Sequence, residues 1–186
     1  MAERTKTNEE FNIVINRCKD LFRKKLYDYG ASWRIMRIPS VTDQIYIKTK
    51  RIRSIGEKGE ALIDEGIASE FMAIVNYGII GLIQLELGPT LDNICSADEA
   101  MALYDKYAKA TYDLMVKKNH DYDEAWRGMR VSSYTDIILM KIWRTKQIEK
   151  LNGHTLVSEG IDANYQDMIN YAIFALIKLE VEKGEE

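Results

Sequence analysis

The chain has 186 residues and a formal net charge of −3, with 46% hydrophobic residues, 30% charged residues and only two prolines. This composition excludes a low-complexity or disordered chain, and the nearly balanced charge disfavours DNA as a partner. Cys18 and Cys95 are isolated thiols without ligand spacing, which argues against a zinc site and favours packing roles.

The N-terminal residues, Met1 to Arg4, lead into polar sequence without an apolar signal segment, so we expect a cytoplasmic protein. The longest uncharged run covers residues 71–85 and is shorter than the ~20 residues that a helix needs to cross a bilayer. We therefore predict that this run lies in a buried core helix and that no membrane is a partner.

The first predicted element is an amphipathic helix. Thr7-Asn8-Glu9-Glu10 has the form of a capping box, in which a hydroxyl and a glutamate each bond the other residue's backbone N–H. Apolar residues then recur at three- and four-residue steps between Phe11 and Phe22. The following segment, residues 28–37, reads Asp-Tyr-Gly-Ala-Ser-Trp-Arg-Ile-Met-Arg and is predicted to form a loop.

Two further helices are predicted in the first half. One follows Ser40 and has Asp43 in its first turn, where a carboxylate favours the helix dipole. The other runs from about Glu65 to Leu87, is the most apolar, and is stopped by Gly88-Pro89. No run of alternating β-branched residues is bounded by turn signals, so we predict an all-α fold.

The second half repeats the first. The loop at residues 28–37 recurs at residues 121–130, and both copies read Asp-Tyr-x3-Trp-Arg-x-Met-Arg. Ser96-Ala97-Asp98-Glu99 repeats the first capping box, and after a one-residue insertion Asn76-Tyr77 pairs with Asn170-Tyr171. Such internal similarity indicates that each copy is one structural unit whose apolar faces meet its twin.

The duplication predicts the architecture. We expect one repeat at residues 1–93 and another at residues 94–186, with about three main helices in each, one shared core and pseudo-twofold symmetry. In the second repeat, the second helix is predicted to end at Asn152-Gly153, and the third to run from about Asp162 to Glu182. The apolar helices also allow a homodimer.

The two loops are candidate binding segments. A tyrosine and a tryptophan can sandwich a base while arginines hold phosphate oxygens through paired N–H donors. The residues leave open a structural alternative, in which each tryptophan plugs the core and its arginines bond local acids and carbonyls. The candidates are Asp28, Tyr29, Trp33, Arg34 and Arg37 in the first loop and Tyr122, Trp126, Arg127 and Arg130 in the second.

The second and third helices add further candidates for binding. Cations three residues apart on the second helix of each repeat project from one helix face. An amide inside an apolar helix must find a partner if it is buried, either through a structural bond to the Asp-Tyr loop or in a ligand. These candidates are Lys48 and Arg51, Lys141 and Arg144, and the amides Asn76 and Asn170.

A magnesium site is predicted in the second repeat. Magnesium prefers two or more carboxylates together with phosphate oxygens, so Asp136 on the second helix needs partners from Glu159 and Asp167. Asp136 and Asp167 are the candidate catalytic residues. The first repeat has Ala73 in place of Asp167, so one site would work and one would scaffold. No Ser/His/Asp arrangement, Gly-rich phosphate loop or CxxC occurs, so catalysis would be metal-assisted hydrolysis.

Three motifs carry a resemblance to known families: Lys-x3-Asp-Tyr-x3-Trp, starting at Lys24 and Lys117, the Thr-Asp-x4-Lys-x2-Arg helices and the Asn-Tyr helices. Over most of both halves, the chain resembles the nucleotide modification associated domain family in duplicated form. More distantly, it resembles the MazG-like all-alpha nucleoside triphosphate pyrophosphohydrolases. That resemblance implies a helical bundle in which magnesium on helix carboxylates activates water to split a nucleotide between its α and β phosphates.

The chain departs from those hydrolases in its acidic residues. They carry a Glu-x2-Glu helix paired with a Glu-x2-Asp helix, and the nearest substitutes here are Asp136 and Asp167-x2-Asn170. Losing carboxylates weakens magnesium binding, so the departure puts catalysis in doubt more than fold.

The leading hypothesis is a nucleotide-binding protein or nucleotide-modification factor, which as an enzyme would be a magnesium-dependent nucleoside triphosphate pyrophosphohydrolase. Trp126 or Tyr122 would face the base, and the first repeat would supply equivalent groups. The alternative is a non-enzymatic helical interaction module whose repeated motifs are structural. A third interpretation, an accessory that touches DNA, rests on a basic zone at residues 17–58. The predicted phosphate-binding residues are Lys117, Arg127, Arg130, Lys141 and Arg144.

Overall fold

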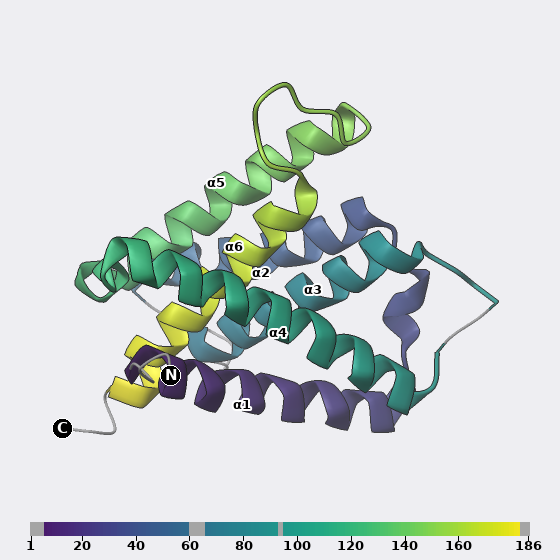
Figure 1. Cartoon of the computed structure of the whole chain (residues 1–186), viewed down its shortest axis with the longest axis horizontal. Coiled ribbons are helices and arrows are strands. Elements are labelled where there is room, and N and C mark those ends of the chain that lie inside the picture. Colours follow the sequence, from purple (N-terminus) through teal and green to yellow (C-terminus); the bar gives the residue numbers. More distant parts are fainter. Residues whose placement is uncertain (1–5, 60–65, 93–94, 183–186) are drawn as a thin grey trace.

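The computed structural model describes residues 6–59, 66–92 and 95–182, and within these ranges every regular element is a helix. The first repeat contains α1 (Lys6–Tyr29), η1 (Ser32–Ile35), α2 (Ile38–Lys58) and α3 (Ile67–Leu87) (Figure 1). The second contains α4 (Ala97–Tyr122), η2 (Ala125–Gly128), α5 (Val131–Lys150) and α6 (Ile161–Leu176), which η3 (Ile177–Val181) extends as a π-helix. The predicted all-α fold with three main helices per repeat is confirmed.

Two helices begin earlier than the sequence predicted. α2 starts at Ile38 and α5 at Val131, so Ser40 and Ser133 lie inside the first turn rather than before it. In α2 the reason is Pro39, whose fixed φ suits the first turn of a helix. The predicted start of α3 at residue 65 and the repeat boundary between residues 93 and 94 lie outside the described residues.

The capping box predicted at the start of α4 is present. The Ser96 hydroxyl accepts a hydrogen bond from the Glu99 N–H at 3.2 Å, and the Glu99 carboxylate accepts one from the Ser96 N–H at 2.8 Å. α3 ends at Leu87 as predicted, and the Gly88 N–H donates back to the Gln84 carbonyl at 2.9 Å.

Equivalent helices of the two repeats meet in pairs. α3 and α6 make the most extensive contact, α2 packs against α5, and α1 contacts α4 as well as both central helices. Figure 1 shows α1 and α4 side by side across one face of the bundle. One continuous hydrophobic cluster contains buried residues from both repeats. This pairing is the arrangement that a pseudo-twofold relation between the repeats requires.

α3 is the one described helix whose length and apolar composition would suit a membrane span. Most of its side chains from Phe71 to Gln84 are buried inside the bundle. Its apolar character is therefore explained by its central position between the other helices, as the sequence predicts.

Gly81 lets α3 and α6 approach closely. A Cβ atom at this position would lie 2.7 Å from the ring of Tyr165, and that ring is fully buried with its hydroxyl 2.7 Å from the Thr42 hydroxyl. We expect Gly81→Ala to lower the free energy of unfolding by about 1–3 kcal/mol, measured by urea denaturation. Gly56→Ala in α2 is the control, because its Cβ would meet open space. An equal loss of stability in both variants would contradict the close-approach explanation.

Candidate functional site

Each tryptophan loop is held by a polar side chain from the third helix of its own repeat. In the first repeat, Gln84 Nε2 donates to the carbonyl oxygens of Arg34 and Met36 at 2.9 and 2.6 Å. In the second, Lys178 donates to the two equivalent carbonyls, at 2.8 Å to that of Arg127. Sequence reasoning missed both residues, because the two repeats use different residue types for the same bond.

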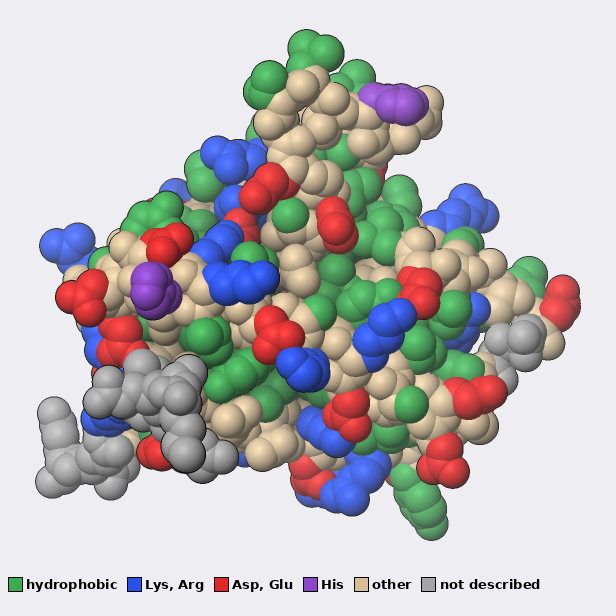
Figure 2. Space-filling view, viewed as in Figure 1, with side chains coloured by type: hydrophobic (Ala, Val, Ile, Leu, Met, Phe, Trp, Pro, Cys, Tyr) green, Lys and Arg blue, Asp and Glu red, His purple; other side chains and the backbone are tan. Residues whose placement is uncertain are grey.

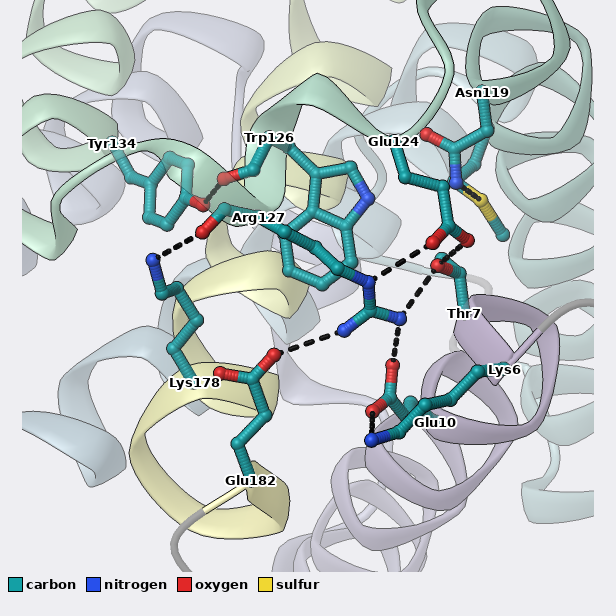
Figure 3. Close-up of polar contacts among 11 residues, drawn as sticks. Lys6, Thr7, Glu10, Asn119, Glu124, Trp126, Arg127, Tyr134, Lys178 and Glu182 are labelled. Carbon is teal, nitrogen blue, oxygen red and sulfur yellow. Dashed lines mark hydrogen bonds and ion pairs between the residues drawn. The ribbon is translucent and has the colours of Figure 1, made fainter.

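Arg127 joins the second loop to the first helix of the other repeat. Its guanidinium donates to Glu10 at 2.5 Å and Thr7 at 2.9 Å on α1, to Glu124 at 3.0 Å and to Glu182 at 2.9 Å (Figure 3). Burial by itself lowers the pKa of this guanidinium, but the bonds to Glu10 and Glu124 outweigh burial and raise the pKa. Arg127 is therefore the centre of an ionic cluster that spans both repeats.

The capping box predicted at Thr7 and Glu10 has a different use. α1 already includes Lys6, and the side chains of Thr7 and Glu10 are buried against the second repeat, where both accept bonds from Arg127. Thr7 and Glu10, which the sequence suggested as a helix cap, thus form a contact with a residue far along the chain, Arg127.

Arg34 also bonds internal groups, in the first repeat, although its Nε is buried without a hydrogen-bond partner among the described residues. It is 5% exposed, and its guanidinium donates to the Gln84 side chain and to the Gly88 carbonyl at 2.8 Å. The arginine that follows each tryptophan, Arg34 or Arg127, therefore bonds internal groups. This matches the structural alternative for these two arginines rather than phosphate binding.

Trp126 cannot sandwich a base. Phe174 stacks on its ring with centroids 4.3 Å apart and planes 5° apart, and the Arg127 guanidinium lies over the same ring at 4.5 Å. Two groups at these distances cannot share one face of an indole, so both faces are covered. A ligand can reach only the edge of the ring.

A pocket lies beside the tryptophan of each repeat, and we call the two the first and second tryptophan pockets. Their volumes are about 290 and 330 Å³. Each is bounded by the end of the first helix, the tryptophan loop and the third helix, at equivalent positions. The paired lining residues include Lys25 and Lys118, Tyr29 and Tyr122, Trp33 and Trp126, Met36 and Met129, Asn76 and Asn170, Tyr77 and Tyr171, and Ile80 and Phe174.

The two asparagines make the same structural bond. Asn76 donates to the Cys18 carbonyl on α1 at 3.0 Å, and Asn170 donates to the Thr111 carbonyl, the equivalent group on α4, at 3.4 Å. The sequence predicted that a structural bond would go to the Asp-Tyr loop. It goes instead to the backbone of the first helix, which the third helix crosses at this point.

The asparagines differ in their acceptor oxygens. Asn76 Oδ1 accepts a bond from the Tyr104 hydroxyl at 2.8 Å. The residue of the first repeat that corresponds to Tyr104 is Phe11, which has no hydroxyl. Consistent with this change, Asn170 Oδ1 is buried without a hydrogen-bond partner among the described residues, and so is the Trp126 Nε1 donor.

An ion triplet centred on a buried aspartate lines the second pocket. Asp167 is buried, with Lys118 Nζ at 2.5 Å from one of its oxygens and Lys141 Nζ at 2.7 Å from the other. Burial lowers the pKa of Lys118, but the bond to Asp167 and its charge outweigh burial and raise it. In the first pocket Ala73 stands where Asp167 does.

In the first repeat, Lys48 and Arg51 form ion pairs with Glu70. Lys48 lies 3.6 Å and Arg51 2.9 Å from the carboxylate of Glu70, one helical turn before Ala73. Because Glu70 does not line the first pocket, this ion cluster is displaced from it. The two tryptophan pockets therefore share a shape and differ in charge.

Lys118 is a site residue that sequence reasoning missed. The sequence pointed to Lys117, which is exposed, whereas the neighbouring Lys118 lines the pocket. Met115, Lys118 and Tyr122 are spaced by three and four residues and line the same pocket, so helical periodicity could have identified Lys118.

The three carboxylates predicted to hold magnesium do not come together. Asp136 is 64% exposed and lines a separate pocket, where its carboxylate lies 3.5 Å from Arg53. Glu159 is exposed in a further pocket beside Arg144, and Asp167 is bonded by two lysines. Within the described ranges, no three Asp, Glu, His or Cys side chains are placed to hold a metal ion. This donor set does not fit magnesium.

The remaining predicted residues lie at the surface. Asp28 is exposed at the end of α1, and Arg37 and Arg130 are exposed at the N-cap positions of α2 and α5. Figure 2 shows positive and negative side chains interspersed over one face of the molecule. On that face no single-sign surface of the kind that binds nucleic acid is seen.

Lys141 connects the second tryptophan pocket to a neighbouring one. The neighbouring pocket has a volume of about 580 Å³ and is lined by Lys141, Arg144 and His154. Part of its wall is the segment between α5 and α6, which projects from the bundle in Figure 1. Cationic side chains thus continue from the edge of one pocket into the next.

These features define an all-α protein of two tandem repeats, each built around a tryptophan loop and a pocket. The family described as nucleotide modification associated domain 1 matches residues 25–85 and 118–179, and this chain belongs to that family. The predicted family, in tandem duplicate, is thereby confirmed. No curated protein and no solved structure gives a significant match. The more distant resemblance to MazG-like hydrolases receives no support from these comparisons.

Proposed function

We propose that this protein binds a nucleotide or modified nucleotide in the second tryptophan pocket. The observation that carries the proposal is that two residues lining one pocket each keep a buried polar atom without a partner among the described residues, the donor Trp126 Nε1 and the acceptor Asn170 Oδ1. A buried polar group left unpaired costs about 1–3 kcal/mol. The edge of a nucleobase presents both a donor and an acceptor, so a bound base would satisfy both groups.

Two tyrosines could hold the plane of the base. Tyr122 is 71% exposed at the end of α4, and Tyr171 is half-buried on α6. Burial raises the pKa of Tyr171, with a further contribution from the charge of Asp167 and a smaller one from Tyr122. Both tyrosines line the second tryptophan pocket, where aromatic rings can stack on a base.

Lysines are available for the phosphates. Lys118 and Lys141 line the base pocket, and Lys141 and Arg144 line the neighbouring pocket, which also contains the acid Glu159. Bound phosphates would share the lysines with Asp167, so affinity should depend on both charge and ionic strength. Because the acidic residues do not fit magnesium, the proposal is binding rather than hydrolysis. Nucleotides are cytoplasmic metabolites, so we place the protein in the cytoplasm.

The interaction-module alternative is supported by Arg34 and Arg127, one from each loop, because each donates hydrogen bonds to other groups of the protein. That observation explains the arginines of the repeated motif. It does not explain why Trp126 and Asn170 leave a buried donor and acceptor in one pocket.

Isothermal titration with nucleoside mono-, di- and triphosphates should detect binding that strengthens with phosphate number. Lys141→Met should weaken triphosphate binding at least tenfold, because its ammonium lies where the phosphates would. Lys48→Met is the matched control, since this equivalent lysine faces Glu70, and it should bind like the wild type. Absence of heat with every nucleotide would favour the interaction module. Pyrophosphate release after addition of magnesium would show that the protein hydrolyses its ligand, contrary to the proposal.

A further inference from the structure

The first tryptophan pocket contains its own unsatisfied group. Trp33 is 7% exposed, lines this pocket, and its Nε1 donor has no hydrogen-bond partner among the described residues. If this region had only a packing role, we would expect larger side chains to fill the space, because protein interiors are close-packed. Both repeats instead keep a cavity beside a buried, unpaired indole N–H.

The charge around the first pocket differs from that of the second. Among the residues that the structure describes, Lys25, which is exposed, is the one charged side chain that lines it. Ala73 replaces the buried acid, and Lys48 and Arg51 are held by Glu70 outside the pocket. A phosphate placed here would lack the cationic wall that the second pocket offers.

The hydrogen-bonding capacity of the first pocket is also narrower. Asn76 Nδ2 donates to the Cys18 carbonyl and Asn76 Oδ1 accepts from the Tyr104 hydroxyl, so this acceptor oxygen already has a partner, unlike that of Asn170. Among the described residues that line this pocket, Trp33 Nε1 is the buried donor without a partner. A ligand that fits must therefore bring a hydrogen-bond acceptor, such as a carbonyl oxygen or a ring nitrogen.

Aromatic rings and small volume define the shape of the ligand. Tyr29, 57% exposed, and the half-buried Tyr77 line the pocket in the places that Tyr122 and Tyr171 take in the second repeat. The volume of about 290 Å³ is at the lower limit of ordinary small-molecule sites, about 300–1,000 Å³. Planar ligands of the size of a base or nucleoside suit such a space.

We propose that the first tryptophan pocket is a second ligand site, which takes an uncharged heteroaromatic ligand, a nucleobase or nucleoside without phosphate. The choice of this ligand class rests on the proposed nucleotide binding of the second repeat. The duplicated protein then holds a phosphorylated ligand in one repeat and an unphosphorylated one in the other. Because α3 packs against α6 and each third helix contributes an asparagine to its pocket, the two sites share one rigid core.

The test is titration of the full chain with the four common nucleosides and, separately, their 5′-monophosphates, followed by calorimetry. At least one nucleoside should bind, and Trp33→Phe, which removes the N–H donor, should weaken that binding at least tenfold. Trp143→Phe is the matched control and should leave nucleoside binding unchanged, because Trp143 is 66% exposed on α5 and lines neither tryptophan pocket. Ala73→Leu, which fills the first pocket without removing a polar group, should also abolish nucleoside binding. Circular dichroism should confirm that each variant is folded.

The outcomes separate the two proposals. If nucleotides bind but no nucleoside does, the second ligand site is overturned and the proposed function stands. If a nucleoside binds with equal affinity to the wild type, Trp33→Phe and Ala73→Leu, the first pocket is not its site. If nucleosides bind in a manner that depends on Trp33 while no nucleotide binds, the first pocket is supported and the proposed function fails.

Discussion

Arg127→Met is expected to lower the free energy of unfolding by about 3–5 kcal/mol, because it removes the hydrogen-bonded cation of the buried Glu10 carboxylate and, of the cations that the structure describes, leaves only Lys6, 3.8 Å away. Glu10 is 3% exposed, and the 2.5 Å bond from Arg127 is its closest ionic contact among the described residues. The variant also removes the guanidinium from the face of Trp126. Chemical denaturation followed by circular dichroism measures the change.

Arg130→Met is the control for Arg127→Met. Arg130 is exposed at the start of α5, three residues from Arg127, and carries the same charge. Its replacement should change stability by no more than about 0.5 kcal/mol, as is usual for surface substitutions. Similar losses in both variants would mean that net charge, rather than the cluster around Glu10, accounts for the effect.

The same cluster predicts a pH dependence. Burial raises the pKa of Glu124, but bonds from Thr7 and Arg127 outweigh burial and lower it below its ordinary value. A lowered carboxyl pKa means that the stabilising contribution is present above the ordinary pKa and is lost as pH falls through the lowered value. Arg127→Met should therefore weaken the loss of stability at acid pH. If the variant loses as much stability between neutral and acid pH as the wild type does, this role of the Arg127–Glu124 pair is contradicted.

The repeat structure was predictable because helical periodicity and duplicated motifs are local patterns. The Asp-Tyr-x3-Trp-Arg segments marked the connections between the first and second helices, and the capping box at Ser96 marked a helix start. The Asp-Tyr pairs themselves end α1 and α4, and each tryptophan lies in a short 3-10 helix rather than in an irregular loop. The cluster around Arg127 was not predictable, because it joins Thr7 and Glu10 to residues more than a hundred positions later. A Thr-x-x-Glu pattern cannot distinguish a local cap from such a long-range contact.

The candidate site was predicted in part. Tyr122, Trp126, Lys141 and Asn170 do line one pocket, because each is placed by the periodicity of its own helix or loop. Asp136 does not join them: it is the counterpart of Asp43, and both are exposed. They were predicted in the first turn of their helices, but because α2 and α5 begin at Ile38 and Val131, both lie in the second turn. Whether a residue one turn along a helix faces a pocket or solvent depends on how the helices cross, and the sequence pattern does not contain that angle.

The difference between Phe11 and Tyr104 offers the sharpest link between fold and function. Beside the first pocket, the Tyr104 hydroxyl donates to Asn76 Oδ1. Phe11→Tyr places a hydroxyl at the equivalent position beside the second pocket, where it should donate to the unpaired Asn170 Oδ1. We expect stability to rise by about 0.5–1.5 kcal/mol, the net value of one hydrogen bond, measured as a higher Tm. Nucleotide affinity should fall about tenfold, or ~1.4 kcal/mol, because the acceptor of the second pocket is then occupied.

Tyr104→Phe is the reciprocal variant. It leaves Asn76 Oδ1 buried without its donor, which should cost about 1–3 kcal/mol of stability, while nucleotide affinity stays at the wild-type value. Stability and affinity thus move in opposite directions only in Phe11→Tyr, an outcome that general loosening or tightening of the bundle cannot produce. If Phe11→Tyr stabilises the fold and nucleotide binding is unaffected, Asn170 is a structural residue and the base lies elsewhere. The absence of a hydroxyl at position 11 would then be a packing difference between the repeats rather than the feature that leaves an acceptor open for a ligand.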